Sequence, residues 1–299
     1  MRYVVYGVGA VGGVIAGHLH RTGHDVTLVA RGAHLAAIRE RGLTLDTHEA
    51  TYVVDAPATD TAADVAWGDD TVVLLTVKSH QTAVAVTDLA AHAPAGTSVV
   101  CAQNGVANER EVLRRFDRTY GLTVMLPSSH LHPGVVVQKC HPVPGILDLG
   151  RYPTGADAVS AAVAADLRAA GFESVPRPDI MAWKYRKLVT NAVGDVATVL
   201  PAEAAALQPL VRAECESVLL AAGITAVTQD EDDERRGELL RERPGDTGPN
   251  SLGQSLARRT PGTEVDFRAG EIVLLGRLHG VPTPANERVQ RATHDLTPQ

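Results

Sequence analysis

The sequence contains little cysteine and few aromatic residues, and both shortages exclude classes of protein. Only three cysteines occur in 299 residues, and Cys101, Cys140 and Cys215 lie far apart without a Cys-x-x-Cys motif. An odd, sparse set of this kind does not form a disulfide framework and is typical of a reducing compartment. Aromatic residues make up 4% of the chain, too few for a surface that stacks nucleic-acid bases.

Excess positive charge and long hydrophobic runs are also lacking. The 28 lysines and arginines against 35 aspartates and glutamates give a net charge of −7, which argues against nucleic acids and anionic membranes as partners. No run approaches the roughly 18 to 20 apolar residues that a membrane span needs. The apolar stretch that begins at Tyr3 is rich in glycine and makes a poor signal peptide. We therefore expect a cytoplasmic protein.

What the chain does contain is the composition of a globular protein, 44% hydrophobic and 21% charged. Its length favours two domains, at roughly 150 residues per domain. The first half alternates short segments rich in β-branched residues with alanine-rich, helix-like segments, which predicts a parallel sheet covered on both faces. The expected strands are Arg2–Tyr6, Asp25–Val29, Thr71–Val77, Thr97–Ala102 and Tyr120–Leu126, and the expected helices include Gly12–Thr22 and Thr82–His92. A hairpin is expected over Leu43–Leu45 and Thr51–Val54, and edge strands over Val135–Cys140 and Ile146–Leu149.

The character of the chain changes after Phe172. Val175–Asp179 contains two prolines, which cannot continue a helix or a central strand, and it reads as a linker. The pattern beyond it predicts helices over 180–200, 203–222, 230–241, 251–258 and 264–279. The sequence therefore predicts an α/β domain over residues 1–176, with a mostly parallel sheet of Rossmann type, and an all-helical domain over residues 177–299.

A glycine motif directly follows the first predicted strand. Gly7, Gly9 and Gly12 form the pattern G-x-G-x-x-G between that strand and a predicted helix. In dinucleotide-binding domains the first glycine allows a tight turn, the second lets the backbone approach the pyrophosphate, and the third allows close packing of helix on strand. The exposed N–H groups at the start of the helix attract the negative pyrophosphate. This context favours dinucleotide binding over an ordinary glycine-rich turn.

The end of the second predicted strand indicates which dinucleotide would bind. NAD sites usually place an acidic residue there, which accepts a hydrogen bond from the ribose 2′-hydroxyl. Here the strand ends at Val29-Ala30-Arg31, about twenty residues after the last glycine of the motif. A guanidinium at that point suits a 2′-phosphate, because it can form two parallel hydrogen bonds to it. We therefore expect NADP, although Arg31 could also be a simple surface cation.

The first predicted helix of the second half carries a polar stripe. Lys187 and Asn191 are four residues apart and share a helix face, which Asp195 continues. A cation, an amide and a carboxylate in line could hold a small polar substrate. Taken alone, the same stripe also fits a solvated face of an amphipathic helix.

Together these segments resemble the ketopantoate reductase family (2-dehydropantoate 2-reductases) over nearly the whole chain. The resemblance rests on several motifs in order and at similar intervals: GVGAVG at 7–12, VKSHQ at 77–81, QNG at 103–105, WKYRKLVTN at 183–191, Asn250-Ser251 and TEVDF at 263–267. The family combines a Rossmann domain with a helical domain, which agrees with the pattern of the chain.

The resemblance implies roles for individual residues. The pyrophosphate of NADPH would be held by the glycine turn and the start of the following helix, at Gly7, Gly9, Ala10, Val11 and Gly12. Further cofactor positions are matched by Arg31, Lys78, Asn104 and Glu264, of which Glu264 would contact the ribose. The catalytic lysine is matched by Lys187. Substrate positions are matched by Asn104, Asn191, Asp195 and Ser251. A small-molecule carbonyl compound is the expected substrate, and the resemblance allows a homodimer.

The expected reaction is reduction of a 2-oxo acid, or a related ketone, to the 2-hydroxy compound. A positioned ammonium can stabilise the developing oxyanion and donate the proton, and Lys187 is the candidate for this role. The neighbouring Arg186 is a poor proton donor because a guanidinium stays charged. Lys184 lies near the same helix face and is the rival to Lys187.

Two departures from the family pattern concern the substrate. Asp195 stands where the family usually has an asparagine, and Ala269 stands where an asparagine usually precedes Gly270. A carboxylate in the pocket would repel a 2-oxo acid unless it were paired or protonated. Ketopantoate itself is therefore a weaker expectation than NADPH-dependent carbonyl reduction.

Other functions remain as alternatives. A dehydrogenase of the β-hydroxyacid or imine reductase type would share a Lys-x-x-x-Asn pair, and a non-catalytic NADP sensor would share the glycine motif. His130, His132, Cys140 and His141 do not form a recognisable metal motif, because Pro133 and Pro142 interrupt both pairs, and no metal is expected. A Ser-His-Asp hydrolase is not supported, since no G-x-S-x-G occurs.

Overall fold

The computed structural model describes residues 1–244, 251–257 and 264–297. Within these residues the chain forms two compact units. The first consists of residues 1–103, 108–180 and 236–244, and the second of residues 104–107, 181–235 and the described residues from 251 onward. Each unit is therefore built from segments that are separate in sequence. The expected division of domains between residues 176 and 177 stays a prediction.

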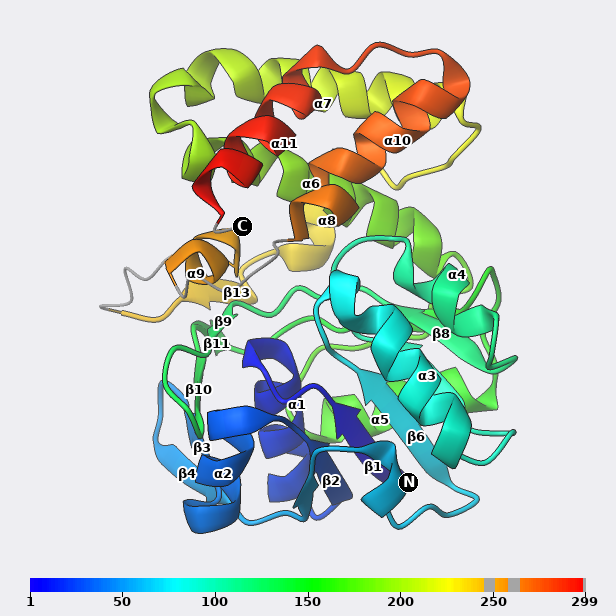
Figure 1. Ribbon diagram of the computed structural model, residues 1–299, viewed down its shortest axis with the longest axis vertical. Helices are drawn as coiled ribbons and strands as arrows, with labels where there is room; N and C mark the ends of the chain where they lie inside the picture. The colour runs from blue at the N-terminus through cyan, green and yellow to red at the C-terminus, as the bar shows by residue number, and fades with distance from the viewer. Residues whose placement is uncertain (245–250, 258–263, 298–299) are drawn as a thin grey trace. The chain divides into compact units, whose positions relative to one another are not determined.

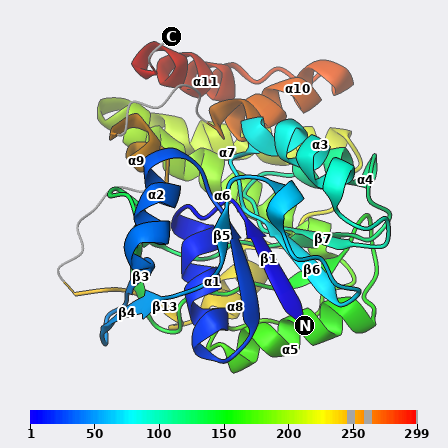
Figure 2. The same cartoon turned by 60° about the horizontal axis from the view of Figure 1, so that its bottom comes forward.

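A seven-stranded sheet forms the centre of the first unit. Its strands follow the order β12-β8-β7-β6-β1-β2-β5, and neighbouring strands are parallel except β12 with β8. Tyr6 pairs with Val29 of β2 and with Leu75 of β6, so the carboxyl ends of these strands lie at one edge (Figure 2). The strands are β1 (Arg2–Tyr6), β2 (Asp25–Val29), β5 (Ala58–Thr59), β6 (Thr71–Leu75), β7 (Ser98–Cys101), β8 (Thr119–Leu122) and β12 (Leu149–Arg151). The predicted α/β class with a mostly parallel sheet is confirmed.

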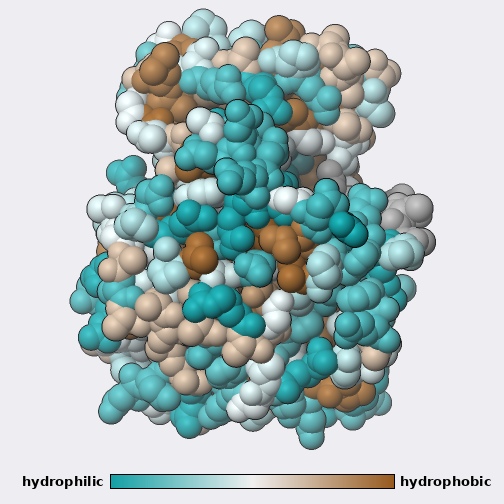
Figure 3. Space-filling model, turned by 180° about the vertical axis from the view of Figure 1, so that it is seen from behind, coloured by the Kyte–Doolittle hydropathy of each residue, from teal (hydrophilic) through white to brown (hydrophobic). Residues whose placement is uncertain are grey.

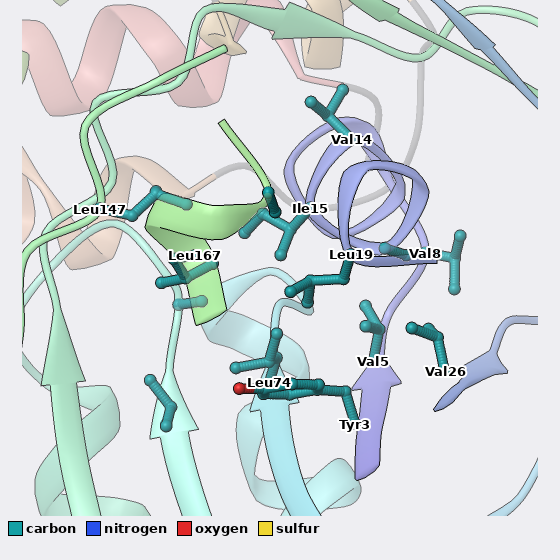
Figure 4. Close-up of a cluster of buried hydrophobic side chains, with 14 of the residues drawn as sticks. Tyr3, Val5, Val8, Val14, Ile15, Leu19, Val26, Leu74, Leu147 and Leu167 are labelled. Carbon is teal, nitrogen blue, oxygen red and sulfur yellow. The ribbon is translucent and has the colours of Figure 1, made fainter. Parts of the chain in front are cut away.

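Helices cover both faces of this sheet, because successive strand residues point to opposite sides. Tyr3 belongs to the core under α1, α2 and α5, whereas Val4 belongs to the core under α3 and α4. Figure 4 shows Ile15 and Leu19 of α1 packed over β1 in the first of these cores. The helices are α1 (Ala10–Arg21), α2 (Gly32–Arg41), α3 (Thr82–His92), α4 (Asn108–Leu113) and α5 (Ala158–Ala169).

Two small sheets complete the first unit, and one of them corrects the expected helix over 230–241. That helix, α8 (Gln229–Arg236), ends where Gly237 takes a φ of 43°, and β13 (Leu240–Glu242) then pairs with β11 (Cys140–Pro142). A three-residue strand gains its hydrogen bonds only from this distant partner, so local pattern could not reveal it. The other small sheet has the order β4-β3-β10-β9 and contains the predicted hairpin. Its strands are β3 (Leu43–Asp46), β4 (Thr51–Val54), β9 (Ser128–Ser129) and β10 (Val135–Gln138).

The second unit is helical, as predicted. α10 and α11 pack against each other and against α7, around a core that includes Leu188 and Val196 of α6 (Figure 1). The helices are α6 (Ile180–Val199), α7 (Ala204–Ala221), most of α8, α9 (Ser251–Ala257), α10 (Ala269–His279) and α11 (Pro284–Leu296). The helix α11 was not predicted; it begins with a proline at its first position, where a missing N–H has no cost.

Hydrophilic residues predominate on the face of the molecule in Figure 3, and hydrophobic ones form small separate patches. Among the described residues, no helix combines the length and the hydrophobicity required to cross a membrane.

A buried histidine links α1 to the strand β10. The Nε2 atom of His18 lies 2.8 Å from Oε1 of Gln138, and its ring packs edge-on against Phe172. Gln138 donates its own amide hydrogen to the Cys140 carbonyl, so its Oε1 accepts from a neutral His18 ring. Burial lowers the pKa of His18 from 6.5 to about 4.

This depressed pKa predicts a pH-dependent stability. Between pH 6.5 and about 4 the unfolded chain binds a proton at His18 that the folded chain does not, so the free energy of unfolding falls as the pH drops through this window. We expect His18→Leu to flatten the dependence by about 2 kcal/mol in chemical denaturation at pH 7 and pH 4.5. His279→Leu, at an exposed position on α10, is the matched control. An unchanged slope in His18→Leu would show that this histidine is protonated equally in both states.

Candidate functional site

The glycine turn after β1 has almost no room for side chains. Gly7 has a φ of 107°, and an added Cβ there would lie 2.7 Å from the backbone nitrogen of Val77. A Cβ at Gly12 would lie 2.3 Å from the Gly7 carbonyl oxygen and 2.4 Å from Oγ1 of Thr76. Gly9, in contrast, has nothing within 4 Å of an added Cβ. The turn is therefore packed tightly against the β6 loop while its Gly9 side stays open, which fits a backbone that a pyrophosphate approaches.

The helix α1 starts directly from this turn. Gly9 is its N-cap, and Ala10 and Val11, both half-buried, are its first residues. No side chain caps the helix start, and no acidic residue occupies its first turn. The N–H groups of the first turn lack intrahelical partners and carry a partial positive charge, so this end suits an anion.

A histidine outside the predicted set supports the turn. His34 of α2 lies with Nε2 2.6 Å from the carbonyl oxygen of Val8, between the first two motif glycines. Its Nδ1 accepts a hydrogen bond of 2.8 Å from the N–H of Gly134. Burial first, and the neighbouring His130 second, lower the pKa of His34 to about 4, so the ring is neutral and donates from Nε2. This role could not be predicted from local pattern, because Val8 and Gly134 are 26 and 100 positions from His34 along the chain.

Arg31 lies at the end of β2, as predicted, and its side chain is exposed. It is the N-cap of α2, and its Nη2 atom donates to the hydroxyl of Tyr6 at 3.3 Å. Tyr6 in turn donates to Asp88 at 2.7 Å, and burial together with this carboxylate raises the pKa of the phenol above its usual value. The contact places the guanidinium beside the end of β1. Its other donors leave Arg31 suited to a phosphate.

The loops after β6 and β7 lie at the same edge of the sheet. Lys78, half-buried, precedes a short 3₁₀ helix over Ser79–Gln81. Gln103 donates from Nε2 to the Val77 carbonyl at 2.8 Å and to Oγ1 of Thr82 at 2.9 Å, which ties the two loops together. In sheets of this kind, ligands bind at the carboxyl ends of the strands where the order reverses, here between β1 and β6. The predicted cofactor residues of the first unit therefore share that edge.

The predicted catalytic face belongs to α6 in the second unit. Lys187 and Asn191 are half-buried one turn apart, and Nδ2 of Asn191 donates to Oδ1 of Asn104 at 3.3 Å. The structure thus joins two predicted substrate residues that are 87 positions apart in sequence. Lys184, the rival lysine, is only 3% exposed. Of the two lysines, Lys187 is therefore the more accessible to a substrate.

Asp195 is fully buried and forms an ion pair, so its negative charge is compensated and need not repel an acidic substrate. Its Oδ2 lies 2.9 Å from Nε of Arg268, an ion pair that is not aligned as a hydrogen bond. Nη1 of Arg268 also donates to Oγ of Ser251 at 3.3 Å. Arg268 was missed from the sequence, although its position just before Ala269, a departure from the family pattern, offered a hint.

The last predicted cofactor position, Glu264, lies near the C-terminal end of the chain. Glu264 lies in a 3₁₀ helix over Glu264–Phe267 of the second unit and is 6% exposed. Its contact with a cofactor ribose stays a prediction, as do the ligand contacts of the other residues. Asn250 and Thr263, which carry part of the resemblance, lie outside the described residues. In the described ranges, no three His, Cys, Asp or Glu side chains converge as metal ligands.

Comparison with known proteins gives matches along almost the whole chain. The family profile described as Ketopantoate reductase PanE/ApbA matches residues 3–154, and its C-terminal counterpart matches residues 179–297. A 2-dehydropantoate 2-reductase of Pyrococcus horikoshii is 28% identical over 292 residues, covering 96% of this chain and 94% of that protein.

Two solved structures align with almost the whole chain. A PanE/ApbA family ketopantoate reductase from Ralstonia eutropha aligns with a TM-score of 0.82 and 26% identity, covering 99% of this chain and 98% of the other. A D-mandelate dehydrogenase, solved with NADH and anilino(oxo)acetate, aligns with a TM-score of 0.85 at 21% identity and the same coverage. At that identity the second likeness shows the fold alone.

The support that His34 gives the glycine turn leads to a prediction about cofactor affinity. His34→Phe removes the hydrogen bonds to Val8 and Gly134. We therefore expect calorimetry with NADPH, the cofactor expected from the sequence, to show binding weakened by roughly tenfold, the value of one to two hydrogen bonds. His20→Phe is the matched control, because the ring of His20 on α1 forms its hydrogen bond with the Asp55 carbonyl and not with the turn. Equal NADPH affinity in parent and His34→Phe would show that the turn holds its shape without His34.

Proposed function

The chain belongs to the ketopantoate reductase PanE/ApbA family, and on that premise we propose that it reduces a 2-oxo acid to the 2-hydroxy acid with NADPH. The observation that carries the proposal is the face of α6 on which a half-buried Lys187 precedes Asn191, itself bonded to Asn104. When bound, NADPH supplies the hydride that is added to the carbonyl carbon.

Lys187 acts on the carbonyl oxygen. Negative charge develops on that oxygen as the carbon is reduced, and an ammonium within hydrogen-bond reach stabilises it and then donates a proton. Asn191 and Asn104 supply amide groups that orient the substrate on the same face. Arg186 does not compete for this role, because it is 8% exposed and its Nε donates to the Val227 carbonyl at 2.6 Å.

The first unit holds the cofactor through its backbone and Arg31. The open side of Gly9 and the first turn of α1 accept the pyrophosphate, and Lys78 adds a cation at the same edge. Arg31 binds the 2′-phosphate that distinguishes NADPH from NADH. The choice of cofactor rests on this residue, since the D-mandelate dehydrogenase with the same fold was solved with NADH.

The role of Lys187 predicts a loss of turnover without a loss of cofactor binding. In Lys187→Ala we expect kcat to fall by about 10² to 10⁴, the usual contribution of a general acid, with the NADPH dissociation constant unchanged. Lys184→Met is the companion variant, measured in the same stopped-flow assay. If Lys184→Met loses turnover while Lys187→Ala keeps it, the two lysines have been assigned in the wrong order.

The role of Arg31 predicts a switch of cofactor. Arg31→Asp removes the partner of the 2′-phosphate and supplies an acceptor for a ribose hydroxyl, so kcat/KM for NADPH relative to NADH should fall by roughly 100-fold or more, as expected when a bidentate charged contact is lost. Arg39→Asp, farther along α2 where the arginine contacts the Ala58 carbonyl, controls for the change of charge. A parent protein that uses both cofactors equally would contradict the assignment.

A further inference from the structure

The buried pair of Asp195 and Arg268 extends the polar face of α6. Asp195 follows Asn191 by one helical turn and Lys187 by two, so all three lie on one side of the helix. Arg268, which directly precedes α10, reaches Asp195 with Nε and Ser251 of α9 with Nη1. We propose that Arg268 and Ser251 bind a carboxylate of the substrate and that Asp195 positions Arg268; this rests on the proposed function.

Burial explains why the two charges must act together. The side chain of Asp195 is 0% exposed and that of Arg268 is 6% exposed. An isolated charge at such a position is very unfavourable, whereas an ion pair offsets much of the desolvation cost. The pair is also neutral as a unit, so Asp195 does not repel an anionic substrate.

The donors of Arg268 are more numerous than its contacts. A guanidinium has five N–H donors in one plane, and the contacts among the described residues involve only Nε and Nη1. The hydroxyl of Ser251 accepts from Nη1, so its own hydrogen can be donated elsewhere. A planar fork beside a hydroxyl donor matches the two oxygens of a carboxylate.

Two carboxylates would fit this description. One is the C1 group next to the ketone, and the other is a group farther along the substrate, since Lys187 and Asp195 are about 12 Å apart along α6 at 1.5 Å per residue. Substrates that differ only in one carboxylate distinguish them. The pair 2-oxoisovalerate and 2-oxoisovaleramide tests C1, and the pair 2-oxoglutarate and 2-oxoglutaramate tests a distal group.

The test uses the double variant Asp195→Asn/Arg268→Met, which removes both charges and so leaves no buried charge without a partner. In one of the two pairs, kcat/KM for the acid should fall by roughly 10- to 100-fold, as expected when hydrogen bonds to a charged group are lost. For the matching amide, kcat/KM of the double variant should stay within about threefold of the parent value, because a neutral amide gains little from a guanidinium. Arg268→Lys keeps the positive charge but loses the planar pair of N–H donors, so kcat/KM for the acid should fall by an intermediate amount.

A second ion pair provides the matched control. Arg177 and Asp148 of the first unit also meet through Nε and Oδ2, at 3.2 Å, with Asp148 buried. Asp148→Asn/Arg177→Met therefore removes an ion pair with one buried partner that belongs to the other unit, and it should leave the ratio of kcat/KM for the acid to that for the amide unchanged. A double variant at Asp195 and Arg268 that keeps the parent ratio in both substrate pairs would overturn the inference.

Equilibrium binding separates this inference from the proposed function. In calorimetry without cofactor, the parent should bind at least one of the two acids about tenfold or more tightly than the double variant. If no ketone is turned over but this difference in binding remains, the proposed reaction fails and the carboxylate site stands. If turnover is normal and the affinities of parent and double variant are equal, the reaction stands and the carboxylate site fails.

Discussion

The close packing of the Gly7–Gly12 turn against the end of β6 is the constraint on which the first unit depends. The backbone at Gly7 and Gly12 approaches Thr76 and Val77 so closely that a single Cβ would force them apart. That packing fixes where α1 begins, and α1 carries much of the core on its face of the sheet. It also places the start of α1 at the carboxyl edge of the sheet, where Arg31 follows the neighbouring strand β2. The same contact therefore serves both the fold and the proposed binding of a pyrophosphate.

In the second unit, the polar face of α6 combines partly exposed groups with a buried charge. Lys187 and Asn191 remain partly exposed on α6, whereas Asp195 on the same face is closed off and neutralised by Arg268. A carboxylate that looks unsuited to an acid-binding site in the sequence thus acts, in our account, as the support of a cation. The charge that a substrate would meet depends on the pair and not on Asp195 alone.

The sequence predicted the parts that depend on local pattern. The strands Arg2–Tyr6 and Asp25–Val29 and the helix Thr82–His92 were predicted with the bounds that the structure has, because their apolar residues and turn signals lie within each segment. It failed where a partner is distant: β13 depends on the edge of β11, and the partner of Asp195 lies 73 residues away at Arg268. The glycine turn was recognisable for the same local reason, whereas the support from His34 was not, since it joins Val8 to Gly134.

The most direct test of the account follows the hydrogen that is transferred. The protein would be incubated with 2-oxo acids, 2-oxoisovalerate among them, and NADPH that carries deuterium on the transferring face of C4, and the products examined by mass spectrometry and NMR. The account predicts a 2-hydroxy acid with one deuterium on C2 and one equivalent of NADP⁺. Tight binding of NADPH with no labelled hydroxy acid from any 2-oxo acid tried would contradict it and indicate a protein that binds the cofactor without this chemistry.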